Sequence, residues 1–329
     1  MMKRSLPLCL SAVLSCGIVA GARAANVPEI FAPGVISGPA GEDCPAFAPD
    51  GNTVFFDRSS GQDVIILVSH KVDGVWSTPQ IAPFSGQWLD HDPVMSPDGS
   101  FLVFTSNRPD TPSGKMLSVV RPDGSVSGAG HLWRVDRERD GWGKPVRLPD
   151  AVNASMRTYA PSIAADGSVY FIRPDQAGTF HIYRSLYRNG AYQTAEQVAL
   201  GDPAAQTHDP AIAPDQSFIV FNSNDAKASA MGDLYIAFRD SDGWGKPIDL
   251  GETINGRGGK WSQWGAHLSP DHRTLYYTSD RTTQPTYPRT PAQAQQQLEQ
   301  MQSWDNGADN IWSVSLAPWL DEPHTAHSE

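Results

Sequence analysis

One stretch of the chain decides the fold, and it reads Asp90-His91-Asp92-Pro93-Val94-Met95-Ser96-Pro97-Asp98-Gly99-Ser100-Phe101-Leu102-Val103-Phe104. Its two apolar runs flank a Pro-Asp-Gly turn, so the stretch predicts a strand, a tight turn and a second strand. Similar stretches occur four more times. The positions equivalent to Pro93 are Pro45, Pro161, Pro210 and Ala266, so the five copies lie 48, 68, 49 and 56 residues apart. Repeats at this period indicate a propeller or a solenoid.

Each copy continues in the same way. A third apolar strand follows, and then an Asp-Gly or Asn-Gly turn, which supplies the positive φ that a hairpin needs, leads into an outer strand. Four antiparallel strands make one propeller blade. The fold class is therefore predicted to be all-β, with one propeller of five four-stranded blades. The expected blades cover 42–84, 90–150, 158–200, 207–251, and 263–319 together with 27–36.

The last blade includes the N-terminal segment because the fifth copy lacks an outer strand of its own. Residues 28–35 resemble the outer strands 145–149 and 247–250, and pairing there would close the ring without an exposed strand edge. Six blades is the alternative, if a diverged blade lies within an insertion. Two insertions separate second and third strands, at 112–130 and 285–307. The first could form a small hairpin around Pro122-Asp123-Gly124, and the second contains a predicted helix over 291–301.

The N-terminus predicts export. Residues 1–24 form an expected signal peptide, with Lys3 and Arg4 before the apolar run 6–19 and a cleavage site at Ala22-Arg23-Ala24. A lipoprotein signal that ends at Cys16 is the alternative. We therefore expect a periplasmic or secreted propeller over 25–320, followed by a tail at 321–329.

The composition excludes several partners. Formal net charge is −11, and removal of the three bases in the signal leaves 36 acids against 22 bases, or −14. An acidic chain without a basic cluster argues against nucleic acid, and beyond the signal no apolar run is long enough to span a membrane. The mature chain keeps only Cys44, so no intramolecular disulfide is expected. A small buried residue is its preferred interpretation, and a reactive thiol is the alternative. No oligomeric state can be predicted.

The repeat resembles that of the TolB family, a WD40-like propeller repeat. The pattern is Pro-x-φ-Ser/Ala-Pro-Asp-Gly-x-x-φ-x-Phe, where φ is apolar, followed by Ser-Asn-Arg or Ser-Asp-Arg. It is clearest at 93–108 and 269–281. The resemblance implies an exported propeller that serves as an interaction platform. It does not extend to the N-terminal domain of TolB or to its six blades. Related repeats also occur in peptidases and in polysaccharide-processing enzymes, so the resemblance does not determine an activity.

The residues just before each first strand are expected to form a ring at one mouth of the central channel. The candidate ligand-binding residues are Asp90, His91, Asp92, Arg108, His208, Asp209, Trp264 and His267. Two copies share His-Asp-Pro, and imidazole beside carboxylate is suited to metal binding or to acid–base chemistry. His91 and His208 are therefore weak metal candidates, although no cofactor is predicted and a divalent metal is left open. The structural alternative is that each acid caps the next blade or pairs with an arginine such as Arg108.

Two functions fit these observations. The preferred interpretation is a binding module for a protein, peptide or glycan at the loop-rich mouth. The alternative is a glycan hydrolase or lyase that uses Asp90, Asp92, Asp209 and the two histidines. Hydrolysis would need two carboxylates about 5–10 Å apart, a separation that only a structure can show.

Overall fold

The computed structural model describes residues 26–61, 63–111, 113–120, 124, 126–224, 232–256, 260–282 and 285–321. The predicted signal with Cys16, the Pro122-Asp123 turn and residues 322–329 of the predicted tail lie outside the described residues. No helix in the described ranges is long and apolar enough to cross a membrane.

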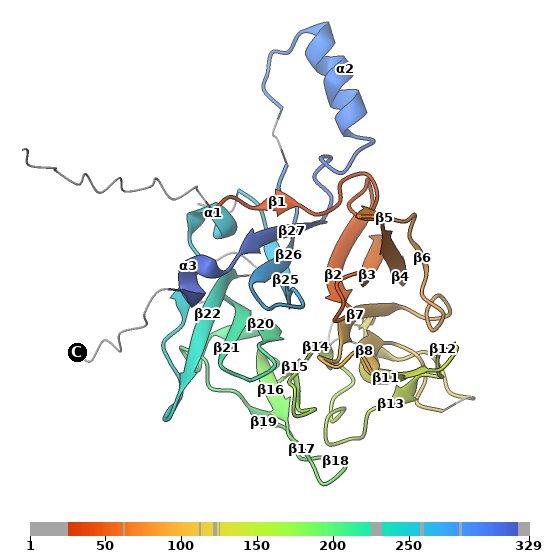
Figure 1. Ribbon diagram of the computed structural model, residues 1–329, viewed down its shortest axis with the longest axis vertical. Helices are drawn as coiled ribbons and strands as arrows, with labels where there is room; N and C mark the ends of the chain where they lie inside the picture. Colours follow the sequence, from red (N-terminus) through yellow and green to blue (C-terminus); the bar gives the residue numbers. More distant parts are fainter. Residues whose placement is uncertain are drawn as a thin grey trace, which may run out of the picture.

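The described chain folds into a propeller of five blades around a common axis, which confirms the predicted fold class and excludes the six-blade alternative (Figure 1). The innermost strands are β2 (Gly41–Phe47), β7 (Asp90–Met95), β14 (Tyr159–Ile163), β20 (Gln206–Ile212) and β25 (Gln263–Leu268). The second strands are β3 (Thr53–Ser60), β8 (Phe101–Ser106), β15 (Val169–Pro174), β21 (Phe218–Asn224) and β26 (Thr274–Ser279). The third strands are β4 (Asp63–Val72), β11 (His131–Glu138), β16 (Phe180–Ser185), β22 (Asp233–Asp240) and β27 (Asn310–Ser315).

The outer strand of the first four blades is broken into two short pieces. The pieces after the hairpin turn are β5 (Val75–Trp76), β12 (Gly141–Trp142), β18 (Ala191–Tyr192) and β23 (Gly243–Trp244). In the third blade, β18 pairs with the short strand β17 (Tyr187–Arg188). The pieces that complete the sheets are β6 (Gln80–Ile81), β13 (Val146–Arg147), β19 (Glu196–Gln197) and β24 (Ile248–Asp249). In the fifth blade β1 (Glu29–Ile30) takes this place, because Glu29 pairs with Ser313 and Ile30 with Trp312 of β27. The N-terminal strand thus closes the ring, as predicted.

Apolar cores fill the spaces between blades. Five clusters of buried residues each join two neighbouring blades, and one of them joins the first blade to the fifth through Phe56, Leu67 and Ile311. Neighbouring innermost strands also contact each other around the whole ring, including β25 and β2. The side chains that point to the axis are therefore held from both sides by packed sheets.

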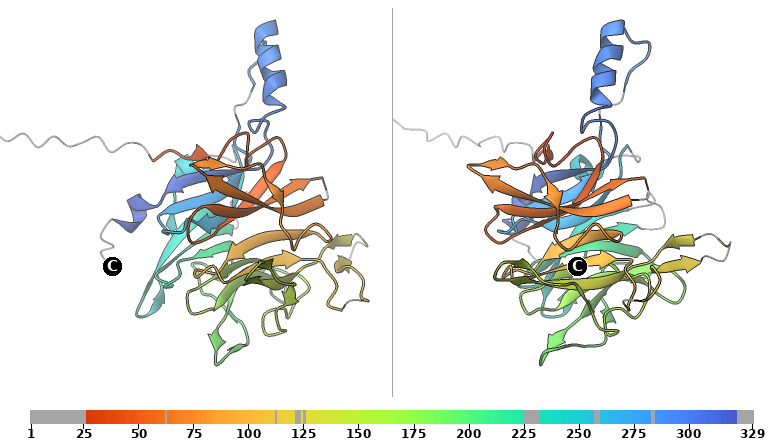
Figure 2. Two further views of the ribbon diagram at one scale, coloured as in Figure 1. Left: turned by 45° about the vertical axis from the view of Figure 1, so that its right-hand side comes forward. Right: turned by 90° about the vertical axis from the view of Figure 1, so that its right-hand side faces the viewer.

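Both insertions contain secondary structure within the described residues. The first forms a hairpin of β9 (Ser118–Val120) and β10 (Val126–Gly128). The second contains α2 (Pro291–Gln300), which begins with a capping box at Thr290 and Gln293 and has no buried residue. α2 projects away from the blades in all three views (Figures 1 and 2). Two four-residue helices, α1 (Glu252–Asn255) and α3 (Ala317–Leu320), complete the described elements.

Candidate functional site at the central axis

A β-bulge recurs in every innermost strand and sets the geometry of the axis. The pairing with the second strand shifts register at the same point in all five blades. The bulge residue has positive φ in each case, and the five are Cys44 (50°), Asp92 (51°), Ala160 (49°), Asp209 (47°) and Gly265 (63°). Proline follows four of them, and a bulge tolerates a residue that cannot donate a ladder hydrogen bond. The Pro-containing motif therefore places one residue per blade at the axis.

Carboxylates beside these bulges join neighbouring blades through hydrogen bonds. The backbone N–H of Asp92 donates to Asp57 Oδ2 at 2.7 Å. The N–H of Ala160 donates to Asp92 Oδ2 at 3.0 Å, and that of Gly265 donates to Asp209 Oδ2 at 3.1 Å. Each acid thus accepts from the bulge residue of the next blade. For Asp92 and Asp209 this is the structural alternative given in the sequence analysis, and Asp57 makes the same contact.

Asp92 has the most complete set of partners. Thr105 Oγ1 donates to its Oδ2 at 3.0 Å, and His91 Nδ1 lies 3.1 Å from the same oxygen. Cys44 Sγ lies 3.6 Å from Oδ1. Burial alone would raise the pKa of Asp92, but the His91 imidazolium and the hydrogen bonds lower it below its usual value. Burial likewise opposes the charged form of His91, and Asp92 outweighs it and raises the pKa of His91.

The other axial acids shift in the opposite direction. Burial raises the pKa of Asp43 to about 6 and that of Asp209 to about 7, and it raises the pKa of Asp57 well above its usual value. Burial and the neighbouring carboxylates also raise the pKa of Cys44. Asp92 therefore stays ionised at pH values where Asp43, Asp57 and Asp209 take up protons.

Cys44, Asp92, Asp209 and His267 line one cavity on the axis. Its volume is about 10 Å³, close to the minimum for a single water molecule. Burial lowers the pKa of His267 to about 4, so this imidazole is neutral at pH 7. The cavity brings together three of the predicted site residues, but it has no room for a sugar ring or a peptide.

Asp90 and Arg108 form a buried ion pair away from this cavity. Arg108 Nη2 lies 2.6 Å from Asp90 Oδ1, and the side chain of Asp90 is 0% exposed. The guanidinium also contacts the rings of Phe104 and Trp133, with its carbon 5.0 and 5.3 Å from their centroids. The same arrangement recurs in the first blade, where Arg58 pairs with the buried Glu42. These two predicted ligand-binding residues are therefore engaged with each other.

A continuous run of aromatic rings lies on the mouth side of the axis. His91 stacks on Tyr159 with centroids 6.1 Å apart, Tyr159 lies 6.2 Å from Phe180, and Phe180 lies 5.6 Å from His208. The guanidinium of Arg157 lies over Phe180 at 4.6 Å. All five side chains are half-buried. We call them the aromatic rim. It links the two predicted histidines, His91 and His208, through residues from the third blade.

The two histidines differ electrostatically. Burial and the nearby His181 lower the pKa of His208 to about 4, whereas Asp92 outweighs the effect of burial and raises the pKa of His91. Trp264 is half-buried and pairs across the sheet with Thr278, outside the aromatic rim.

The sequence prediction missed Phe180 and Arg157. The position of Phe180 in the repeat could have identified it, because Phe180 begins a third strand and third strands start at the mouth.

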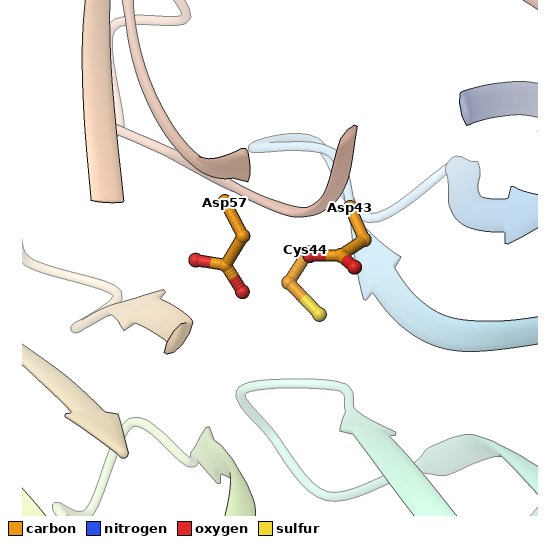
Figure 3. Close-up of side chains that lie close together, drawn as sticks. All are labelled: Asp43, Cys44 and Asp57. Carbon is orange, nitrogen blue, oxygen red and sulfur yellow. The ribbon is translucent and has the colours of Figure 1, made fainter. Parts of the chain in front are cut away.

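A second group, which the predicted site residues do not include, consists of Asp43, Cys44 and Asp57. One ligand atom from each lies within 4.8 Å of the other two (Figure 3). Asp43 and Asp57 face each other across the β2–β3 pair. The equivalent second-strand residues in the other blades are Thr105, Ile172, Asn222 and Thr278. Only the first blade among these has an acid there, and that break in the repeat was visible in the sequence.

Comparisons with known proteins give the fold and no family. No family model matches the sequence, and a comparison with curated proteins gives no match. The structure is similar to an α-L-arabinofuranosidase from Lactobacillus brevis, with a TM-score of 0.54 and 10% identity over 85% of this chain and 91% of that one. It is also similar to the GH43 protein BlXynB from Bacillus licheniformis, with a TM-score of 0.50 and 12% identity over 88% of this chain and 54% of that one.

TolB from Acinetobacter baumannii is a further structural neighbour, with a TM-score of 0.45 and 15% identity over 84% of this chain. The present chain spans 54% of the length of that TolB. At 10–12% identity, the similarities to the arabinofuranosidase and to BlXynB show a shared propeller fold, and they assign neither binding nor hydrolysis to this chain.

Proposed function

We propose that this propeller is an exported binding module that holds a protein, peptide or glycan at its mouth without chemically changing it. The aromatic rim is the observation that carries the proposal. Half-buried aromatic rings bind apolar side chains and sugar rings by stacking, and their few torsions make ordering inexpensive in entropy. Arg157 adds a cation beside Phe180 that can pair with an acidic group on the ligand.

The engagement of the mouth carboxylates supports binding over hydrolysis. Asp90 is paired with Arg108, while Asp92 and Asp209 accept backbone N–H groups from the next blade. A glycosidase needs two carboxyl groups on either side of a bound sugar, and small-molecule sites usually enclose about 300–1,000 Å³. The axial cavity that Asp92 and Asp209 share has a volume of about 10 Å³, so it offers no such arrangement.

The proposal can be tested with peptide and oligosaccharide arrays probed with the purified protein. Hits should lose at least about tenfold in affinity when Arg157→Gln or Phe180→Ala is introduced, because each change removes a large contact at the centre of the rim. Tyr187→Ala is the matched control, since Tyr187 is an aromatic residue of the β17–β18 hairpin that contacts Tyr192 away from the rim. Equal losses in the control and the rim variants would contradict a site at the rim.

Catalysis would be revealed by a different result. Turnover of chromogenic glycosides by the wild-type protein, abolished by Asp209→Asn with an unchanged melting temperature, would replace the binding proposal with the hydrolase alternative.

Export rests on the N-terminal sequence and is a separate part of the proposal. Fractionation of expressing cells should recover the protein outside the cytoplasm, with Ala25 or Asn26 as the first residue. A mature chain that begins at Cys16 and partitions with membranes would instead establish the lipoprotein alternative.

A further inference from the structure

The Asp43–Cys44–Asp57 group has the composition of a metal site. It offers two carboxylate oxygens and one sulfur within 4.8 Å of one another (Figure 3). The ligands of a single zinc ion lie about 2.0–2.3 Å from it and hence about 3–4 Å apart. The upper limit of 4.8 Å is about 1–2 Å above the spacing that a zinc ion requires, so binding would draw the three side chains together. The three are fixed by the β2 bulge and by the facing strand β3, so the site is built on rigid elements.

A buried oxygen without a partner points to an occupant. Asp57 is 1% exposed, and only its Oδ2 receives a hydrogen bond from a donor in the described chain, the N–H of Asp92. Its Oδ1 is fully buried and receives none from a backbone, hydroxyl or nitrogen donor, which leaves a proton shared with the Asp43 carboxyl as its partner within the described chain. A buried acceptor left in this state is costly unless a cation or a shared proton satisfies it.

A second such oxygen, from the fifth blade, lies near Cys44. Thr278 in the fifth blade is 0% exposed, and its Oγ1 has no hydrogen-bond partner among the described residues. The place where a side chain at Gly265 would begin lies 3.1 Å from Thr278 Oγ1 and 3.4 Å from Cys44 Sγ. Because Gly265 has no side chain, the hydroxyl and the thiol border the same small space.

Further acidic side chains surround the group. Asp92 Oδ1 lies 3.6 Å from Cys44 Sγ, and Asp209 shares the axial cavity with Cys44. That cavity can hold about one water molecule, which would supply a further ligand. His91 is the one cationic partner that the structure gives Asp92, and it lies on the mouth side. A divalent cation would therefore enter a region in which acids outnumber bases.

We propose that Asp43, Cys44 and Asp57 bind one divalent ion of the zinc class at the junction of the first and fifth blades. A set of two oxygens and one sulfur favours such a borderline ion over calcium or magnesium, which prefer oxygen ligands alone. The ion would tie β2 to β3 within the first blade, next to the place where that blade packs against the fifth. This inference is independent of ligand binding at the aromatic rim.

Metal analysis of the intact purified protein provides the first test. Protein loaded with Zn²⁺ and then dialysed should retain about one zinc per chain. Asp57→Asn should weaken zinc binding by at least about 10–100-fold, since even the outer partners of a metal site contribute that much. Asp63→Asn, which changes an exposed acid in the same blade, is the matched control and should retain zinc. Wild-type protein that retains no zinc, or an Asp57→Asn variant that retains as much as wild type, would overturn the proposal.

Cobalt tests the thiol ligand directly, because the absorption of a cobalt–thiolate bond reports the bond itself rather than the stability of the fold. Co²⁺-loaded wild-type protein should show the near-ultraviolet absorption of a cobalt–thiolate bond, and Cys44→Ser should lose it while keeping its circular dichroism spectrum. A cobalt spectrum that is unchanged in Cys44→Ser would remove the thiol from the site. If no metal changes the spectrum or the melting temperature, a proton shared by Asp43 and Asp57 occupies the position, and the metal proposal is wrong.

Discussion

Replacing Arg108 with methionine separates a structural role from a ligand-binding one. The change keeps an apolar stem between Phe104 and Trp133 but removes the charge that pairs with Asp90 at 2.6 Å. Asp90 is 0% exposed, and Ser85 Oγ, 3.0 Å from its Oδ2, would remain as its side-chain donor. Breaking a buried ion pair by removing one partner costs about 3–5 kcal/mol, because the other charge stays buried.

That cost is large for a protein whose total stability is about 5–15 kcal/mol. At about 2–4 °C per kcal/mol, the melting temperature should fall by roughly 6–20 °C. Thermal and urea unfolding followed by circular dichroism measure the change. The control is Asp136→Asn, which disrupts the exposed Arg134–Asp136 pair and should cost about 0–1 kcal/mol.

A double variant sharpens the test. Asp90→Asn combined with Arg108→Met removes both charges, so it should recover at least about half of the lost stability. The reasoning is refuted if Arg108→Met melts within the range of the Asp136→Asn control. If that variant also lost binding to an array hit, Arg108 would be a ligand contact, as the sequence first predicted.

Three further predictions concern the axis, the mouth and the ring closure. Gly265→Ala should destabilise the protein by about 1–2 kcal/mol more than Gly190→Ala, since both glycines have positive φ but only the first is crowded. His208 is neutral in the fold with a pKa of about 4. The unfolded chain therefore takes up the extra proton between pH 6.5 and 4, and stability falls as pH decreases through that window. Unfolding of His208→Gln at several pH values should show a shallower decline. Removal of β1 should expose the edge of β27 and cause aggregation, which light scattering during a thermal ramp would detect. Deletion of α2, which has no buried residue, should cause no such scattering and should leave the melting temperature unchanged.

The blade architecture could be predicted because its determinants are local. The Pro-Asp-Gly turn and the apolar runs around it specify two strands within about fifteen residues, and the pattern repeats. The closing strand could also be predicted, because 28–35 resembles the outer strands. In the structure only Glu29 and Ile30 of this segment pair with β27. The 291–301 helix was likewise predicted from Pro291 and the helix-forming residues that follow.

The axial geometry could not be predicted in the same way. A bulge of one residue turns Cys44, Asp92 and Asp209 toward a common cavity, and strand alternation alone gives no such convergence. The contacts that follow join residues far apart in the chain, such as Asp92 and Ala160. The aromatic rim depends on Phe180, which belongs to no repeated motif, so a search of the repeats passes over it.

The five copies also show how to separate packing from function in this fold. Bulge, proline and apolar strand recur in nearly every blade, which is what closure of a ring requires. The exceptions gather in two places. The second-strand position facing the bulge is Asp57 in the first blade, where other blades have Thr, Ile or Asn. The third blade alone places Tyr159 and Phe180 between two histidines. A packing role predicts equal costs for equivalent substitutions around the ring, so unequal effects at these two places would locate the functions that the repeat does not explain.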